Sequence, residues 1–200
     1  MSLTPATPSA HHKHSHCSTC GAPYGDATGW PRTCQACGDV AYRNPLPVAV
    51  ALLPVAYGTG KDVSGADGTG ADSPGTAEGV GLVVITRTIA PARGAVALPG
   101  GFVDHREDWR RAVVRELHEE TGIEAAMGDV RLADALSSPD GHLLLFGLLP
   151  PRTAGELPPP TPTAETDGWH VLRAPGQLGF PLHTIAVRQW FAGRYANVAR

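Results

Sequence analysis

The sequence lacks a long apolar run, a signal peptide and an excess of positive charge. No segment approaches the roughly 18 to 20 apolar residues that a membrane-spanning helix needs, which excludes a spanning protein. The first residues, MSLTPATPSAHHKHSH, contain no apolar stretch of the kind that signal peptides carry. The formal charge is −3, whereas a general nucleic-acid binder is usually basic. We therefore expect a cytoplasmic protein whose partner is neither a membrane nor, in general, a nucleic acid.

Charged residues are also scarce, at 18% of the 200 residues, while there are 24 glycines and 19 prolines. This composition predicts one main domain with long irregular segments. Residues 57–79 are almost entirely Gly, Ala, Ser, Thr and Asp, and we expect a flexible insertion because so little apolar surface cannot offset the entropy of ordering. Residues 1–15 are expected to be a disordered tail, and their histidines are either a solvated tail, a cloning remnant or a weak site for stray metal.

The four cysteines form two C-x2-C pairs close together in the chain: Cys17, Cys20, Cys34 and Cys37. Each pair can present two thiolates to one ion, and both pairs together complete the tetrahedral S4 site that suits Zn²⁺. Two disulfides are the alternative, which is disfavoured because nothing marks the chain as secreted. We predict a zinc ribbon over residues 16–45, and a structural zinc because four thiolates leave no open coordination position.

Residues 46–200 are predicted to form one α/β domain on a mixed sheet. Apolar and β-branched runs predict strands at 47–55, 80–87, 130–138, 142–149 and 168–172, with a short strand leading into the glycine turn at 97–101. The first two strands suggest a hairpin around the insertion, and Pro139-Asp140-Gly141 predicts a second hairpin turn. The proline-rich stretch 150–166 is expected to be extended, without a packed element.

Two helices are expected in this domain. The first runs from Asp108 to Thr121, with Gly122 as a left-handed stop, and should turn Trp109, Ala112, Val113 and Leu117 toward the core. The second covers residues 184–194 and should place three large apolar side chains inward: Ile185, Trp190 and Phe191.

Three glutamates have a spacing that brings them to one face of the first helix. Glu116, Glu119 and Glu120 stand at i, i+3 and i+4. Their like charges repel one another, and a hard divalent cation such as Mg²⁺ would remove that repulsion. An ordinary solvated helix face is the alternative for three glutamates alone. The preceding Gly100-Gly101 favours the metal site, because it lets the backbone approach closely and can offer a carbonyl to an ion.

Glu107 and Arg115 complete this constellation. A carboxylate at the helix start, where Glu107 lies, complements the helix dipole. Arg115 is placed to pair with Glu107 or Glu119 and so to hold the loop on the helix.

The whole pattern resembles the signature of the Nudix hydrolases: Gly101-x5-Glu107-x7-Arg115-Glu116-Leu117-x-Glu119-Glu120-x-Gly122-Ile123. The paired C-x2-C motifs followed by AYRNP further resemble the zinc-ribbon branch of that family. The resemblance covers about residues 46–195 and implies an α/β/α sandwich that hydrolyses a nucleoside diphosphate linked to another moiety, with Mg²⁺ or Mn²⁺.

The resemblance also assigns roles to individual residues. It implies that the three helix glutamates are metal ligands, with the Gly100 or Gly101 carbonyl as a further candidate, and that Glu107 and Arg115 fix the loop. Family members often bring a glutamate from a late loop to the metals, which makes Glu165 a candidate general base beside Glu119 and Glu120. A solvated loop acid is the alternative for Glu165.

The substrate is less defined by the resemblance. The stretch ADALSSPDGHLLLFG lacks the SQPWPFP-type motif of family members that act on NADH, and Pro139 resembles the ADP-ribose pyrophosphatases, although a hairpin turn explains it equally well. We expect an ADP-linked substrate such as ADP-ribose, ahead of nucleoside triphosphates.

Two alternative functions and the possibility of a homodimer stay open. One alternative is a ligand-sensing regulator, in which we would expect some of the signature carboxylates to be lost; this chain has kept them all. The other is a nucleic-acid binder led by the ribbon, whose basic residues between 17 and 45 are only Arg32 and Arg43. An enzyme is therefore favoured. Whether the ribbon mediates contacts in a homodimer is left open.

Overall fold

The computed structural model describes residues 13–25, 29–57 and 79–197. It divides into two compact units between Pro45 and Leu46, here called unit 1 and unit 2. Most of the tail expected at 1–15 and nearly all of the insertion expected at 57–79 lie outside the described residues. Within the described residues, no helix combines the length and the apolar character that crossing a bilayer would require.

Unit 1 is built around its cysteines. Its only regular elements in the described ranges are β1 (Arg32–Thr33) and β2 (Val40–Ala41), which pair antiparallel. Its buried apolar residues are Cys17, Tyr24 and Cys34, with Ala22 and Ala41 packed against them. So small a core supplies little hydrophobic stabilisation, because that term scales with buried apolar area.

Unit 2 contains two sheets. The first has the order β7 (Gly100–Phe102), β3 (Leu46–Leu52), β9 (His142–Leu148), β8 (Arg131–Ser137). The second has the order β10 (Arg152–Thr153), β4 (Pro54–Tyr57), β5 (Gly79–Arg87), β11 (Thr166–Leu172), and β6 (Val96–Ala97) also pairs with β5. Because β3 runs parallel to β9 but antiparallel to β7, the sheet is mixed, as predicted.

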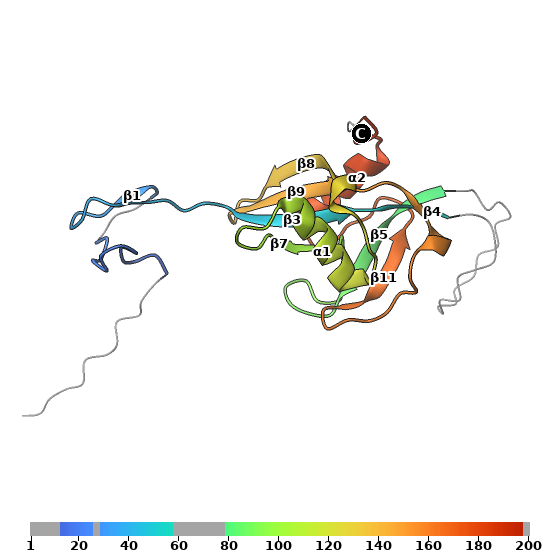
Figure 1. The fold of residues 1–200 in the computed structure, drawn as a ribbon, viewed down its shortest axis with the longest axis horizontal. Coiled ribbons are helices and arrows are strands. Elements are labelled where there is room, and N and C mark those ends of the chain that lie inside the picture. Colours follow the sequence, from blue (N-terminus) through green and yellow to red (C-terminus); the bar gives the residue numbers. More distant parts are fainter. Residues whose placement is uncertain (1–12, 26–28, 58–78, 198–200) are drawn as a thin grey trace, which may run out of the picture. The chain divides into compact units, whose positions relative to one another are not determined.

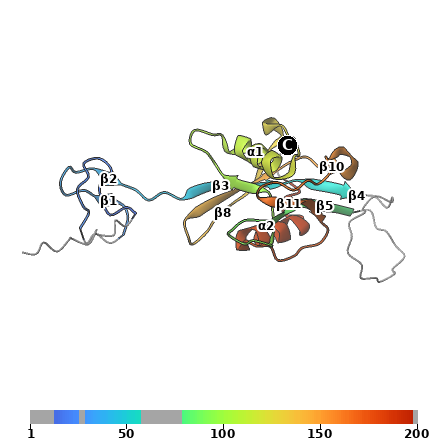
Figure 2. The same ribbon diagram turned by 90° about the horizontal axis from the view of Figure 1, so that it is seen from below.

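The two long helices lie on opposite sides of these sheets (Figure 2). Helix α1 (Trp109–Thr121) packs over β3, β7 and β11 (Figure 1), and α2 (Pro181–Phe191) covers the other side. Short 3₁₀ turns, η1 (Met127–Asp129) and η2 (Ala154–Glu156), join the remaining elements. The architecture is the α/β/α sandwich predicted from the sequence.

The core follows the alternation of the strands. Ala49, Ala51 and Val83 face α1, where they meet Ala112, Val113 and Leu117. Their neighbours in the chain face α2 instead: Val50, Leu52, Leu82 and Val84. Each fully buried Val or Leu contributes about 1.5–3 kcal/mol, so the two layers hold the helices firmly on the sheets.

The predicted hairpins are present. Strand β4 pairs antiparallel with β5, and β8 pairs antiparallel with β9 across the turn that contains Asp140 and Gly141. The single strand expected at 47–55 is wrong, because the chain passes from one sheet to the other at Leu53. The carbonyl of Leu52 accepts from Leu149 N–H in the first sheet, whereas that of Leu53 accepts from Val83 N–H in the second.

Two further expectations need correction. The proline-rich stretch 150–166 contains β10 and η2, because a capping box closes the turn: the Thr153 N–H donates to the Glu156 carboxylate at 2.7 Å. Helix α2 begins at Pro181, not at 184, with the proline at the first helical position, which its fixed φ favours.

The helix face of α2 was also predicted wrongly at one position. Its buried residues are His183, Thr184, Ala186 and Val187, and Trp190 and Phe191 are partly buried against the same cluster. Ile185 lies on the outer side and is 40% exposed, because the inward positions follow the helical period from 183 to 190.

Candidate functional site

Helix α1 presents the glutamates with defined ends. The Asp108 carboxylate accepts from Arg110 N–H at 2.8 Å, so Asp108 is the N-cap and the helix begins at Trp109. Gly122 ends the helix with φ 72°, as predicted. With Ala112, Val113 and Leu117 buried, the Glu119 side chain is exposed, whereas the Glu116 side chain is only 14% exposed and Glu120 turns inward.

The two glycines before the helix are required by close approach. A Cβ atom on Gly101 would lie 2.4 Å from Glu116 Oε1, and one on Gly100 would lie 2.4 Å from the carbonyl oxygen of Ala49. A side chain at Gly100 would push β7 away from β3, and one at Gly101 would displace the Glu116 carboxylate. The glycines therefore let the backbone reach the carboxylates.

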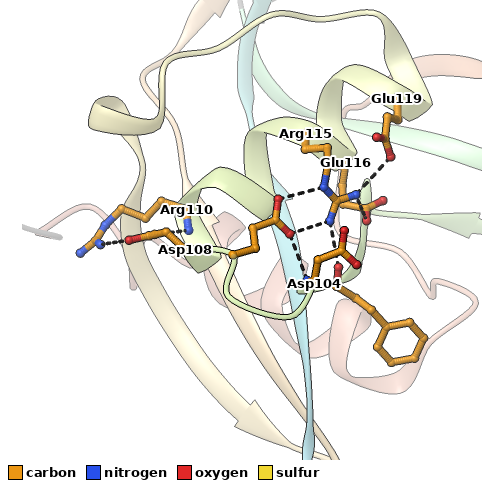
Figure 3. Close-up of polar contacts among 8 residues, drawn as sticks. Asp104, Asp108, Arg110, Arg115, Glu116 and Glu119 are labelled. Carbon is orange, nitrogen blue, oxygen red and sulfur yellow. Dashed lines mark hydrogen bonds and ion pairs between the residues drawn. The ribbon is translucent and has the colours of Figure 1, made fainter.

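Arg115 lies at the centre of the acidic cluster (Figure 3). Its Nε and Nη2 donate to the two oxygens of Glu107, both at 2.9 Å, and Nη2 also donates to Phe102 O at 3.0 Å. Nη1 donates to Glu116 Oε1 at 2.6 Å and to Glu119 Oε2 at 3.2 Å. The sequence predicted a pairing with Glu107 or Glu119, and the structure contains both. Arg115 thus ties the loop after β7 to α1.

The electrostatics of Glu107 follow from this network. The paired guanidinium holds the pKa of Glu107 below its usual range, with the Asp104 N–H adding a smaller effect in the same direction. The carboxylates in turn raise the pKa of Arg115. Glu107 therefore acts through Arg115, more than through the helix dipole that the sequence suggested.

Glu120 is the buried member of the set, with 4% of its surface exposed. Its Oε2 accepts from Gly100 N–H at 2.9 Å. Burial raises its pKa to about 8, the charges of Glu116 and Glu165 add to the rise, and the Gly100 N–H and Arg87 oppose it. Burial likewise raises the pKa of Glu116, against the effect of Arg115. A carboxylate with a raised pKa gains most from a nearby cation.

The structure brings Glu165 to this cluster from the loop before β11. Its carbonyl accepts from Thr88 N–H at 2.8 Å, and the next residue, Thr166, donates its hydroxyl to Glu120 O at 3.0 Å. The charge of Glu165 is close enough to raise the pKa of both Glu116 and Glu120.

Arg87 is a neighbour that the sequence interpretation missed. It ends β5 directly opposite Thr166, its Nε donates to Pro91 O at 2.9 Å, and its guanidinium lies 5.4 Å from the ring centroid of Phe180. Its charge lowers the pKa of Glu120. The available signal was an arginine at a strand end, but the register that places it beside residues 165–166 is not visible in the sequence.

The donor set of the carboxylate site fits a hard divalent cation. Three carboxylates from one turn of α1 lie beside a glycine backbone, and oxygen ligands of this kind suit Mg²⁺ or Mn²⁺. In the structure their oxygens are held by Arg115 and the Gly100 N–H. Among the described residues, the four cysteines are the group whose ligand atoms already lie close enough together to share one ion.

The cysteine site matches a zinc tetrahedron. The Sγ atoms lie 3.7 Å apart for Cys17 and Cys37 and 3.6 Å apart for Cys20 and Cys34, and all four are within 4.8 Å of one another. A tetrahedron with Zn–S bonds of about 2.3 Å has edges of about 3.8 Å. All four cysteines are free of disulfides, and the described tail histidines, His14 and His16, are not part of the group. The four-sulfur arrangement expected of a zinc ribbon is present.

The two cysteine knuckles share one backbone geometry. Gly21 N–H donates to Cys17 O at 2.9 Å and Gly38 N–H to Cys34 O at 2.8 Å, and both glycines have φ near 76°. Backbone N–H groups of Cys20 and Thr19 lower the pKa of Cys17, whereas, against the effect of the Asp39 N–H, side-chain hydrogen bonding with Cys20 raises the pKa of Cys37. The thiolate is the metal-binding form, so the backbone of the knuckle favours ligation at Cys17.

Comparison with known proteins gives one family. The NUDIX domain model matches residues 74–191. An ADP-ribose pyrophosphatase from Methanocaldococcus jannaschii is 39% identical over 80 residues, which are 38% of this chain and 46% of that protein. The chain therefore matches about half the length of this curated relative.

Solved structures share the fold. A NUDIX hydrolase from Nitrosomonas europaea superposes with a TM-score of 0.60 at 18% identity, covering 92% of this chain and 93% of that one. The NUDIX domain of Shewanella oneidensis NrtR, complexed with ADP ribose, superposes with a TM-score of 0.56 at 16% identity, covering 76% and 90%. At these identities the likeness concerns the fold alone.

Proposed function

This chain belongs to the Nudix family, and from that premise we propose that it is a hydrolase that cleaves the diphosphate bridge of an ADP-linked compound of the ADP-ribose type, with Mg²⁺ or Mn²⁺. The observation that carries the proposal is the intact carboxylate set of Glu116, Glu119 and Glu120, of which Arg115 holds the first two and the Gly100 N–H holds the third. The ADP-ribose pyrophosphatase similarity supports the choice of substrate.

The three glutamates would hold the divalent ion, which when bound neutralises the diphosphate and lowers the pKa of a coordinated water. The chain itself keeps their positions through Arg115, which spaces Glu116 and Glu119, and through the Gly100 N–H, which orients Glu120. Mutual repulsion of the carboxylates is thereby limited before any ion binds.

Glu165 is proposed as the general base. Within the described ranges its carboxylate makes no hydrogen bond, whereas Glu119 is engaged by Arg115 and Glu120 by Gly100. Glu165 takes the proton of the attacking water, the new bond forms to one phosphorus, and the bridging oxygen leaves with the other phosphate. ADP-ribose would thus give AMP and ribose 5-phosphate.

Arg87 is proposed to bind a substrate phosphate. Among the described residues its guanidinium donates a hydrogen bond through Nε alone, to Pro91 O, and a guanidinium carries further N–H donors in a planar fork that fits phosphate. Its position opposite Thr166, beside Glu165 and Glu120, would set an anion next to the carboxylate site. Arg87 would supply a positive charge to the substrate, whereas the guanidinium of Arg115 is already bonded to glutamates.

The four cysteines are proposed to hold a structural zinc that organises unit 1, because a complete S4 site has no position for substrate.

A substrate screen tests the proposal directly. Purified protein with Mg²⁺ is given ADP-ribose, NADH, FAD and ATP, and the products are identified after reaction in ¹⁸O-labelled water. We expect kcat/KM for ADP-ribose or another ADP-linked compound to exceed that for every nucleoside triphosphate. A clear preference for a triphosphate would contradict the proposed substrate, and binding of ADP-ribose without turnover would contradict its cleavage.

The role of Arg87 has its own test. Replacing it in Arg87→Gln should lower kcat/KM by about 10- to 100-fold, mainly through KM, because one charged hydrogen bond contributes about 1.5–3 kcal/mol. Arg93→Gln, an exposed arginine in the following loop, is the matched control and should behave as wild type. Equal effects of both changes would argue against a phosphate contact.

A further inference from the structure

A separate cavity of about 630 Å³ lies where the turn after α2 meets the ends of β9 and the start of β4. Its lining includes Pro54, Pro150 and Pro151 together with Trp190 and Tyr195. None of its lining residues belongs to the carboxylate site. The volume falls within the range of about 300–1,000 Å³ that small-molecule sites occupy.

The aromatic wall of this cavity is fixed in place. Tyr195 is 5% exposed, and its hydroxyl donates to Asp134 Oδ2 at 3.0 Å and lies 3.2 Å from Gln189 Oε1. Trp190 makes an edge contact with Phe191, with ring centroids 4.8 Å apart. Proline rings form much of the remaining wall. A preformed wall of this kind costs little ordering entropy when a planar ligand enters.

Two charged side chains line the same cavity. Arg131 is held by backbone carbonyls, since its Nη1 donates to Gly128 O at 2.6 Å and to Val130 O at 3.2 Å. In the part of the chain that the structure describes, Arg131 has no carboxylate partner, and the Asp129 carboxylate accepts no hydrogen bond. The cavity is therefore lined by aromatic rings, a cation with unused donors and a carboxylate acceptor.

We propose that this cavity is a second ligand site, which binds a nucleoside monophosphate. The base stacks on Trp190, the phosphate binds Arg131, and sugar hydroxyls or a base amino group donate to Asp129. Inorganic phosphate would leave the aromatic wall unused, and an uncharged nucleoside would leave Arg131 unused. The site goes beyond the proposed hydrolysis, because no step of that reaction involves these residues.

Calorimetric titration tests the proposal without any turnover. Full-length protein in magnesium-free buffer is titrated with AMP, adenosine and inorganic phosphate. We expect one AMP per chain, with adenosine and phosphate each at least about tenfold weaker, as expected when stacking and a charged contact both contribute. Absence of AMP binding at millimolar concentration would overturn the proposal, whatever the enzyme hydrolyses.

Three variants locate the binding. Arg131→Gln should weaken AMP about tenfold or more while leaving adenosine unchanged. Arg188→Gln, an exposed arginine of α2 outside the lining, is the charge-matched control and should bind AMP as wild type does. Arg87→Gln should also leave AMP binding unchanged. If Arg87→Gln abolishes binding and Arg131→Gln does not, AMP occupies the carboxylate site and the proposal is wrong.

Discussion

The two candidate metal sites differ in what holds their ligands before an ion binds. The four cysteine sulfurs converge within 4.8 Å, placed by two backbone knuckles. The three glutamates of α1 are held by protein donors, Arg115 and the Gly100 N–H. The thiolate site is thus shaped for its ion by local backbone geometry, while in the carboxylate site protein groups take up the negative charge.

The difference follows from the units around the sites. Among the described residues of unit 1 the core has three buried members, so we expect its folding to depend on a bound metal. Unit 2 has two apolar layers that keep α1 in place irrespective of an ion. Removing metal should therefore unfold the first unit and only inactivate the second.

The largest effect is expected from the thiolate site. Cys34→Ser should remove the zinc and unfold unit 1, because zinc binding supplies on the order of 10 kcal/mol to domains of this kind. The zinc content measured by elemental analysis should fall from about one ion per chain to none. The melting temperature of unit 2 should stay the same. A disulfide in the wild-type protein, detected by mass spectrometry, would contradict the assignment of these cysteines to a zinc site.

A smaller effect is expected at the carboxylate site. Glu120→Gln should lower kcat by roughly 10²- to 10³-fold, because it removes a charge that would hold the metal. Melting temperature should stay equal or rise, since the amide oxygen still accepts from Gly100 N–H and an amide, unlike the buried carboxyl, gains nothing by ionising when the chain unfolds. Glu124→Gln, on an exposed glutamate beyond the helix, controls for charge. Near wild-type turnover of Glu120→Gln would contradict the metal-ligand assignment.

The smallest effect is a pH dependence of stability. The pKa of Glu120 is raised to about 8 in the fold from about 4.3 in an unfolded chain. The folded state keeps a proton that the unfolded state releases, so stability falls as pH rises through this window, by at most about 1.4 kcal/mol per pH unit.

Comparing wild type with Glu120→Gln isolates this contribution. Burial lowers the pKa of His183 to about 3, so stability also falls as pH drops below about 6.5, but equally in both proteins. In magnesium-free buffer, the stabilisation by Glu120→Gln should grow from pH 4.5 to 8 and then level off. Denaturant unfolding of unit 2 measures it, and a difference independent of pH would rule out a titrating Glu120.

Local signals predicted much of this structure. Asp108 and Gly122 defined α1, and the Asp140-Gly141 turn defined a hairpin, because capping and turn chemistry act within a few residues. The cysteine spacing predicted its cluster for the same reason.

Long-range packing was less accessible. The outward position of Ile185 depends on where α2 begins, and the strand break at Leu53 depends on which sheet each carbonyl joins. The burial of Glu120 and the approach of Arg87 arise where α1, β5 and β11 meet. No spacing in the sequence encodes that meeting.

The parallel pairing of β3 with β9 has a consequence for synthesis of the chain. Leu46–Leu52 pairs in register with His142–Leu148, after the whole of α1 and β8 have been made. The cysteine knuckles need only neighbours between residues 17 and 39. During synthesis, the cysteine ligands that we propose for zinc are therefore complete before the apolar β3 obtains its partner strand β9. The nascent chain is then most exposed to aggregation and to chaperones along residues 46–52, because long-range strand pairing forms late.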